Sequence, residues 1–183
     1  MESGVTPKCH QIDDDRGPGE LPSVCNALPF TVEHARTPEQ YAAGGEIFTA
    51  YARFLGLDLE FQGFSQEMQS LHRMYGPPSG CLLLARRGEV YIGAVGLREF
   101  EPGVAEMKRM FVLPEHQGGG VGKALVEAFL AAGKALGYRA VKLDSVRSLD
   151  KALALYRQLG FVEIAPYRFN PYPDAVFMER PLI

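Results

Sequence analysis

Residues Gln117-Gly118-Gly119-Gly120-Val121-Gly122 decide the fold of this chain. The stretch follows an apolar run over residues 105–113 and precedes apolar residues at helical spacing, so it is predicted to form a strand-to-helix turn. Glycines at such a turn leave backbone N–H groups free to converge on an anion, and the helix N-terminus adds partial positive charge. Four glycines within five positions lower stability through backbone entropy. The stretch therefore predicts a phosphate-binding turn, with a ligand-free glycine turn as the alternative.

Two common phosphate-binding motifs do not fit this turn. The dinucleotide pattern G-x-G-x-x-G fails because its last position falls on Lys123 or on Leu125. The Walker pattern fails because Ala124, rather than Ser or Thr, follows Gly122-Lys123. An enzyme that binds the phosphates of another nucleotide stays open as an interpretation of the turn alone.

Composition excludes several classes of protein. The chain has 183 residues, of which 46% are hydrophobic and 22% charged, as is typical of one globular domain. The net charge is -3 and the basic residues are scattered, which argues against nucleic acid as a partner. No apolar run approaches the ~20 residues of a spanning helix, so no membrane partner is expected. Three cysteines without C-x-x-C spacing and four dispersed histidines predict neither a metal site nor disulfides, which favours the cytoplasm.

The chain divides into an N-terminal segment and one domain. Residues 1–29 are rich in Pro and Gly and are predicted to form a flexible extension, which lacks the pattern of a secretory signal. In the domain, Thr37 and Gln40 match a capping box, with Pro38 at the first helical position. The predicted strands cover residues 30–36, 81–85, 90–95, 105–113, 140–143 and 175–178, and the predicted helices begin after Thr37, Ser65, Gly120 and Ser148. This order indicates a mixed α/β sheet covered by helices.

Three segments resemble the GNAT family of N-acetyltransferases. Gln117, Gly120 and Gly122 fill the [RQ]-x-x-G-x-[GA] signature of that family. Residues 105–114 resemble its central strand, and residues 155–161 resemble its L-Y-x-x-x-G-F signature. The resemblance covers residues 30–183 and implies a single α/β N-acetyltransferase domain. Its central sheet is expected to be mostly antiparallel and flanked by helices, with an acetyl-CoA slot between the two central strands. Leu149 departs from the Asn that the family often has at the start of the last helix.

The resemblance also implies a set of site residues. Glu106 is the candidate general base and Tyr156 the candidate general acid for the CoA thiolate. The alternatives are a structural pair between Glu106 and Lys108, which alternation puts on one face of the strand, and a core tyrosine at position 156. The residues expected to bind acetyl-CoA are Met110, Phe111, Val112, Gln117, Gly118, Gly119, Gly120, Val121, Gly122 and Lys123, the last with a solvated helix residue as alternative.

The implied activity is transfer of an acetyl group from acetyl-CoA to a primary amine of a small molecule or peptide. None of the three cysteines lies in the motif region, so direct attack in a ternary complex is favoured over a covalent acyl-enzyme. The expected protein is a cytoplasmic monomer or homodimer that needs no metal. The alternative from another class is a non-catalytic acyl-CoA-binding regulatory module.

Overall fold

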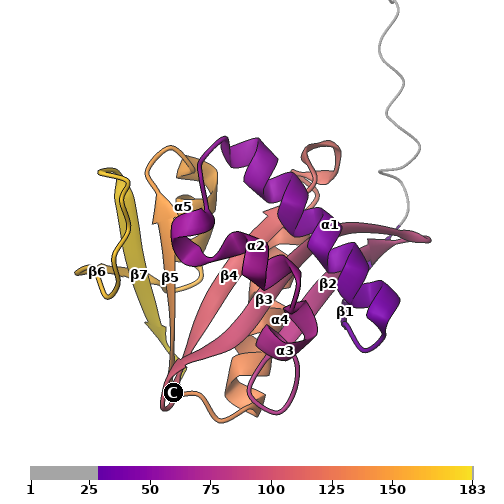
Figure 1. Cartoon of the computed structure of the whole chain (residues 1–183), viewed down its shortest axis with the longest axis horizontal. Coiled ribbons are helices and arrows are strands. Elements are labelled where there is room, and N and C mark those ends of the chain that lie inside the picture. Colours follow the sequence, from indigo (N-terminus) through magenta and orange to yellow (C-terminus); the bar gives the residue numbers. More distant parts are fainter. Residues whose placement is uncertain (1–28, 183) are drawn as a thin grey trace, which may run out of the picture.

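The computed structural model describes residues 29–182, and its centre is a seven-stranded sheet (Figure 1). The predicted extension over residues 1–29 therefore lies almost wholly outside the described residues. The strands follow the order β1-β2-β3-β4-β5-β7-β6. They are β1 (Phe30–His34), β2 (Cys81–Arg87), β3 (Val90–Glu101), β4 (Val104–Val112), β5 (Ala140–Val146), β6 (Val162–Ile164) and β7 (Ala175–Pro181). All neighbours pair antiparallel except β4 and β5, so the predicted mixed, mostly antiparallel sheet is confirmed.

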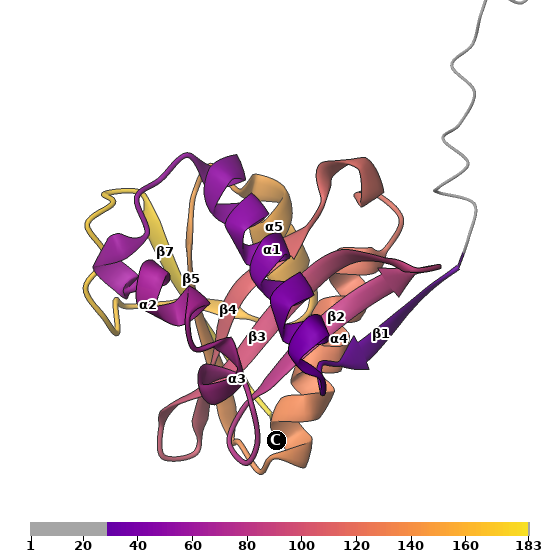
Figure 2. The same ribbon diagram turned by 45° about the vertical axis from the view of Figure 1, so that its right-hand side comes forward.

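Helices cover both faces of the sheet (Figures 1 and 2). One face carries α1 (Pro38–Leu55), α2 (Phe64–Met68) and α3 (Leu71–Met74), and the other carries α4 (Val121–Ala135) and α5 (Asp150–Gln158). Two short 3-10 turns, η2 (Glu60–Gln62) and η3 (Pro114–His116), complete the described elements. No helix within residues 29–182 has both the length and the apolar character needed to cross a membrane.

Helix α1 begins and ends as the sequence predicts. The backbone N–H of Gln40 donates to Thr37 Oγ1 at 3.3 Å, and the Thr37 N–H donates to Gln40 Oε1 at 3.1 Å, which completes the capping box. Gly56 ends the helix in the left-handed region, with φ of 63°. This helix places Tyr51 and Phe54, near its C-terminal end, beside the middle of the sheet.

Three details of the predicted elements are wrong. The helix expected after Ser65 is two short helices, because Ser70 has φ of -140° and interrupts the helical backbone. Helix α5 is capped by Leu149 rather than by Ser148, and no side chain caps it. Strand β6 was not predicted, since its three residues are mostly exposed and carry no apolar alternation.

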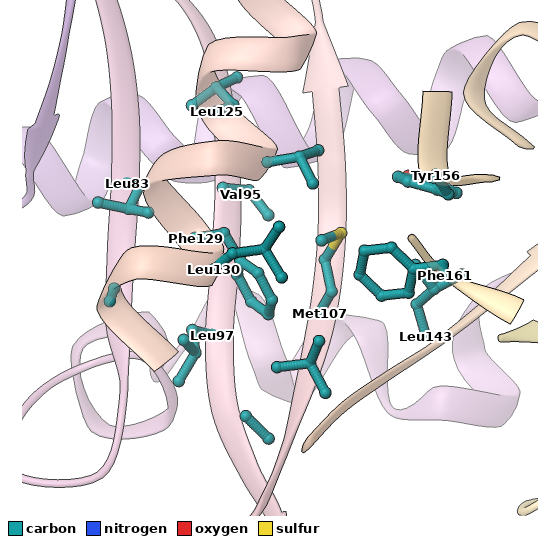
Figure 3. Packing of buried hydrophobic residues seen from close by; sticks show 14 of the residues in the cluster. Leu83, Val95, Leu97, Met107, Leu125, Phe129, Leu130, Leu143, Tyr156 and Phe161 are labelled. Atoms are coloured by element: carbon teal, nitrogen blue, oxygen red, sulfur yellow. The ribbon is translucent and has the colours of Figure 1, made fainter. Parts of the chain in front are cut away.

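The core consists of two apolar clusters, one on each face of the sheet. In β2, Leu83 belongs to the cluster under α4, whereas Leu82 and Leu84 belong to the cluster under α1. Both faces are covered, so the apolar run in this strand is continuous rather than alternating. Figure 3 shows the first cluster, where Met107 of β4 lies between Phe129 of α4 and Phe161.

Strands β4 and β5 separate half-way along the sheet. Their parallel pairing is limited to Val104 with Ala140, Ala105 with Val141 and Glu106 with Lys142. Beyond these pairs the two strands diverge (Figure 1). A bulge in β4 accompanies the divergence, because Gly96 lies opposite Lys108 but Ala94 lies opposite Phe111. The second half of β4 therefore has an edge that no strand of the described residues occupies.

Candidate active site

The glycine turn leaves its backbone donors open. Gly118 and Gly120 have φ of 81° and 80°, values that favour glycine, and Gly120 begins α4 without a side-chain cap. The first backbone bond of this helix joins the Ala124 N–H to the Gly120 carbonyl at 3.0 Å. Within residues 29–182, no hydrogen bond is donated by the N–H groups from Gly118 to Lys123. A Cβ added to either Gly118 or Gly120 would meet nothing within 4 Å, so the space beside these two glycines is open.

The other residues of the turn act through different groups. Gln117 Nε2 donates to the Val112 carbonyl at 2.9 Å, so its side chain fixes the turn to the end of β4. The Val121 side chain is buried in the core, which leaves only its backbone for a ligand. Lys123 is exposed and lies 3.8 Å from Glu127 one helical turn away, a weak surface pair. These contacts fit an anion held mainly by backbone groups and by the partial charge of the helix N-terminus.

Residues Met110, Phe111 and Val112 form the end of β4 where β5 has diverged. The Phe111 ring packs against Tyr51 and Phe54 of α1, with ring centroids 5.6 and 5.3 Å apart. Because no strand pairs with this edge, an extended ligand can lie along it as an additional strand would. The edge leads directly to the glycine turn through η3.

Tyr156 of α5 is 6% exposed, and its ring lies 5.7 Å from the ring of Phe161 (Figure 3). No hydrogen bond within the described part of the chain involves its hydroxyl. Burial, together with nearby Tyr51, raises the pKa of Tyr156 above the usual 10. The phenol therefore stays protonated at neutral pH and can donate a hydrogen bond, although it is a weaker acid than a free phenol.

Glu106 lies in a ring of hydrogen-bond donors. Its Oε2 accepts from Arg98 Nε at 2.9 Å and from Arg98 Nη2 at 2.7 Å. Its Oε1 accepts from Arg168 Nη1 at 2.6 Å and from the Tyr167 hydroxyl at 3.0 Å. Burial alone would raise the pKa of this fully buried carboxyl, but the charges of Lys108, Arg98 and Arg168 lower it to about 2.

This geometry bears on both interpretations of Glu106. A carboxylate with so low a pKa, and with its oxygens already accepting hydrogen bonds, is a weak proton acceptor. The contacts therefore weigh against the general-base role, which stays a prediction. The alternative, a pair with Lys108, needs correction, because the hydrogen-bonding partners are Arg98, Arg168 and Tyr167.

A cavity of about 40 Å³ lies where β4 and β5 diverge. Its walls include Tyr51, Leu57, Gln62, Lys108, Asp144 and Tyr172. The sequence predicts Lys108 only as a partner of Glu106, and Tyr51, Leu57, Gln62 and Asp144 were not predicted as site residues. An apolar strand interrupted by a lysine was the one signal available for Lys108. Asp144 and Gln62 lie in segments that contain no motif, and only the fold brings these two residues together.

Metal-ligating residues do not gather in the described part of the chain. Within residues 29–182, no group of three or more His, Cys, Asp or Glu side chains is arranged to hold an ion. Cys81 is buried at the start of β2, and burial raises the pKa of its thiol to about 12. The other two cysteines, Cys9 and Cys25, lie outside the described residues.

Comparison with known proteins agrees with this geometry. The sequence profile of the Acetyltransferase (GNAT) family matches residues 46–161. The chain belongs to the GNAT family. An uncharacterized N-acetyltransferase from Schizosaccharomyces pombe is 38% identical over 130 residues, which covers 70% of this chain and 80% of the relative. An IAA acetyltransferase from Azospirillum brasilense is 35% identical over 132 residues, covering 71% and 84%.

Solved structures share the fold of this GNAT protein. A GNAT acetyltransferase from Staphylococcus aureus aligns with a TM-score of 0.71 and 18% identity, over 85% of this chain and 100% of the other. A Salmonella typhimurium structure solved with acetyl-CoA aligns with a TM-score of 0.61 and 18% identity, over 84% and 94%. Family membership and the named relatives make the chain an N-acetyltransferase.

Proposed function

We propose that this GNAT protein transfers an acetyl group from acetyl-CoA to the primary amine of a small molecule or peptide, by direct attack in a ternary complex. The observation that carries the proposal is the uncapped glycine turn beside the free edge of β4. Lys108 in the cavity wall, the strand edge at Met110–Val112 and the glycine turn follow one another along the chain from β4 to α4, and this series is called the groove here. The Salmonella structure with acetyl-CoA, which shares the fold, supports this choice of cosubstrate.

The residues present fit acetyl-CoA. The N–H groups from Gly118 to Lys123 would hold its pyrophosphate, because they are unsatisfied within the described residues and a Cβ at Gly120 meets nothing. The backbone of Met110, Phe111 and Val112 would hold the pantetheine arm. When bound, acetyl-CoA supplies the acetyl group as an activated thioester. Tyr156, whose hydroxyl stays protonated, would donate a proton or a hydrogen bond to the leaving sulfur.

Direct transfer is supported by the lack of a reactive cysteine within residues 29–182. Cys81 is the one cysteine within the described residues, and its raised pKa keeps the thiol protonated and unreactive. An acceptor amine with a pKa of ~10.4 must lose a proton first, at a cost of roughly 4.6 kcal/mol at pH 7. Because two arginines already donate to Glu106, this carboxylate is a weak acceptor for that proton.

The turn can be tested with two matched substitutions. Gly120→Val places a branched side chain where the pyrophosphate would lie, and it should abolish acetyl-CoA binding measured by calorimetry. Gly137→Val is the control, because Gly137 also has a positive φ, of 84°, and also has nothing within 4 Å, but lies just beyond the other end of α4. Each substitution should cost about 1–3 kcal/mol of stability through backbone strain. A folded Gly120→Val protein with normal affinity contradicts the cosubstrate assignment.

Catalysis is tested by release of free thiol from acetyl-CoA over a panel of amines. The proposed enzyme releases thiol in proportion to acetylated product. A non-catalytic acyl-CoA-binding module would bind acetyl-CoA with the same dependence on Gly120 and release no thiol with any amine.

A further inference from the structure

The polar floor of the cavity is built from the two strands that diverge. Lys108 follows the last paired residue of β4, Glu106, by two positions, and Asp144 follows the last paired residue of β5, Lys142, by two positions. Alternation keeps each of these side chains on the same face as its paired predecessor. Lys108 and Asp144 therefore face one another across the gap, with Lys108 Nζ 3.7 Å from Asp144 Oδ1.

Lys108 has donor capacity that the described residues do not use. Its ammonium group carries three N–H donors. Nζ makes one hydrogen bond, to Gln62 Oε1 at 2.7 Å, and the 3.7 Å to Asp144 is too long for a second. The side chain is 4% exposed, so bulk water does not readily replace the missing acceptors. A ligand oxygen in the cavity would satisfy the remaining donors.

Asp144 has one oxygen occupied and one available. Its Oδ2 accepts from Gln62 Nε2 at 2.9 Å and from Asn170 Nδ2 at 3.0 Å. Within residues 29–182, its Oδ1 has two longer ionic contacts and no hydrogen bond: Lys108 Nζ lies at 3.7 Å and Arg168 Nη1 at 4.0 Å. Gln62 bridges the pair, since its amide oxygen accepts from Lys108 and its amide nitrogen donates to Asp144. Oδ1 is thus placed to accept from a ligand N–H beside the Lys108 donors.

The charges of the ion-pair network that contains Lys108 and Asp144 do not balance. The connected network holds three cations and two anions, which leaves one positive charge in excess when all are ionised. The cations are Arg98, Lys108 and Arg168, and the anions are Glu106 and Asp144. Burial, opposed by these carboxylates, lowers the pKa of Lys108 to about 8. A buried excess of positive charge is stabilised by an anion. Most of the remaining walls are apolar or aromatic, among them Leu57, Phe61 and Tyr172, and the polar ones are Arg109, Ser145 and Asn170.

We propose that the amine acceptor carries its own carboxylate, as an α-amino acid does: the carboxylate binds Lys108 and the amine binds Asp144 Oδ1. This inference rests on the proposed acetyltransferase function and specifies its substrate class. The carboxylate of the acceptor is the anion that the excess positive charge requires, and it supplies the acceptor oxygens that Lys108 lacks.

The test uses matched acceptors that differ in the carboxylate alone. Leucine, methionine and phenylalanine are compared with 3-methylbutylamine, 3-(methylthio)propylamine and phenethylamine, their decarboxylated counterparts. For each, kcat/KM is measured by thiol release, and binding is measured by calorimetry in the presence of CoA. We expect the amino acid of at least one pair to be favoured by tenfold or more in kcat/KM or in affinity.

Two variants assign that preference to the cavity floor. Lys108→Met keeps the length of the side chain and removes its charge, so the preference should fall below about threefold through loss of affinity for the amino acid. Gln62→Glu leaves Lys108 in place and puts a competing carboxylate beside it, with the same expected effect if Lys108→Met fails to fold. The control is Lys142→Met, an equal change of charge on β5 at a residue that pairs with Glu101 and Glu179 outside the cavity. It should keep the preference.

The outcomes separate this inference from the proposed function. Failure to bind acetyl-CoA overturns the proposed function. Two results overturn only the carboxylate inference while acetyl-CoA still binds normally. In the first, the enzyme uses or binds both members of every pair equally. In the second, it binds no amino acid. A preference that survives in both Lys108→Met and Gln62→Glu also overturns it, because the carboxylate would then bind elsewhere.

Discussion

Replacing Glu106 by Gln separates a catalytic base from a structural anchor. Gln is nearly isosteric with Glu, but its neutral amide presents an NH₂ group to donors that already surround the site. Arg98 and Arg168 would then keep two buried or half-buried positive charges without the carboxylate between them. Breaking a buried ion pair in this way destabilises proteins by about 3–5 kcal/mol. We expect Glu106→Gln to lower the free energy of unfolding by an amount in that range.

The pH dependence of stability gives an independent value for the contribution of Glu106 to the free energy of unfolding. The pKa of Glu106 is lowered from 4.5 to about 2, and each unit is worth ~1.36 kcal/mol, so ionisation of Glu106 contributes roughly 3 kcal/mol of stability. Because the folded pKa lies below the unfolded one, this contribution is complete above about pH 4.5 and is lost as the pH falls towards 2. The stability difference between wild type and Glu106→Gln should therefore be constant near neutral pH and shrink in acid.

The assay combines urea unfolding with kinetics across pH. Glu101→Gln is the control, since Glu101 forms an exposed pair with Lys142 at 2.9 Å and should cost less than about 1 kcal/mol. With one confirmed acceptor, an anchor role predicts a loss of kcat/KM that is uniform with pH. A base role predicts a loss of ~10²–10⁴-fold that shrinks at high pH, where the amine is neutral without help. Unchanged unfolding together with such a pH-dependent loss would refute the anchor argument.

Three further substitutions address the remaining parts of the fold and site. Tyr156→Phe should reduce the turnover number by ~10²-fold or more with little change in acetyl-CoA affinity, and an unchanged turnover number with chemistry rate-limiting would make Tyr156 a packing residue. Gln117→Leu removes the 2.9 Å bond to the Val112 carbonyl, worth about 1 kcal/mol, so calorimetry should show acetyl-CoA affinity reduced by roughly tenfold at most. Thr37→Ala removes a helix cap far from the groove and should cost about 1 kcal/mol in urea unfolding while kcat/KM stays the same.

The parts of the fold that could be predicted have local causes. The capping box at Thr37 and Gln40 and the left-handed Gly56 are complete within a few residues of sequence, and the structure confirms them. The strand-to-helix turn at Gly120 was predictable for the same reason. The separation of β4 and β5 was expected only through the family resemblance, because no pattern in residues 104–112 or 140–146 indicates where the pairing of the two strands ends.

The surroundings of Glu106 could not be predicted, because they come from distant segments. Arg98 contacts Glu106 as its cross-strand neighbour on β3, and predicting this contact requires the register between β3 and β4. Tyr167 and Arg168 reach it from the segment between β6 and β7, about sixty residues later in the chain. Alternation along β4 correctly placed Lys108 on the same face as Glu106, but it carries no information about side chains arriving from other elements. A charged residue in an apolar strand indicates a site, and its partners decide which chemistry that site can perform.

The bulge in β4 connects the weakly predicted helix α2 to the groove. Arg109 has φ of 57°, a conformation that costs a non-glycine residue about 1–3 kcal/mol. Its guanidinium donates to the buried carboxylate of Glu67 in α2, with Nη2 to Oε2 at 2.8 Å, and the Tyr75 hydroxyl donates to Glu67 Oε1 at 2.6 Å. This ion pair offsets the strain and holds the bulge in place. Because the bulge lies between Lys108 and the edge formed by Met110–Val112, the short helix α2 helps to set how the acceptor cavity and the proposed acetyl-CoA groove meet.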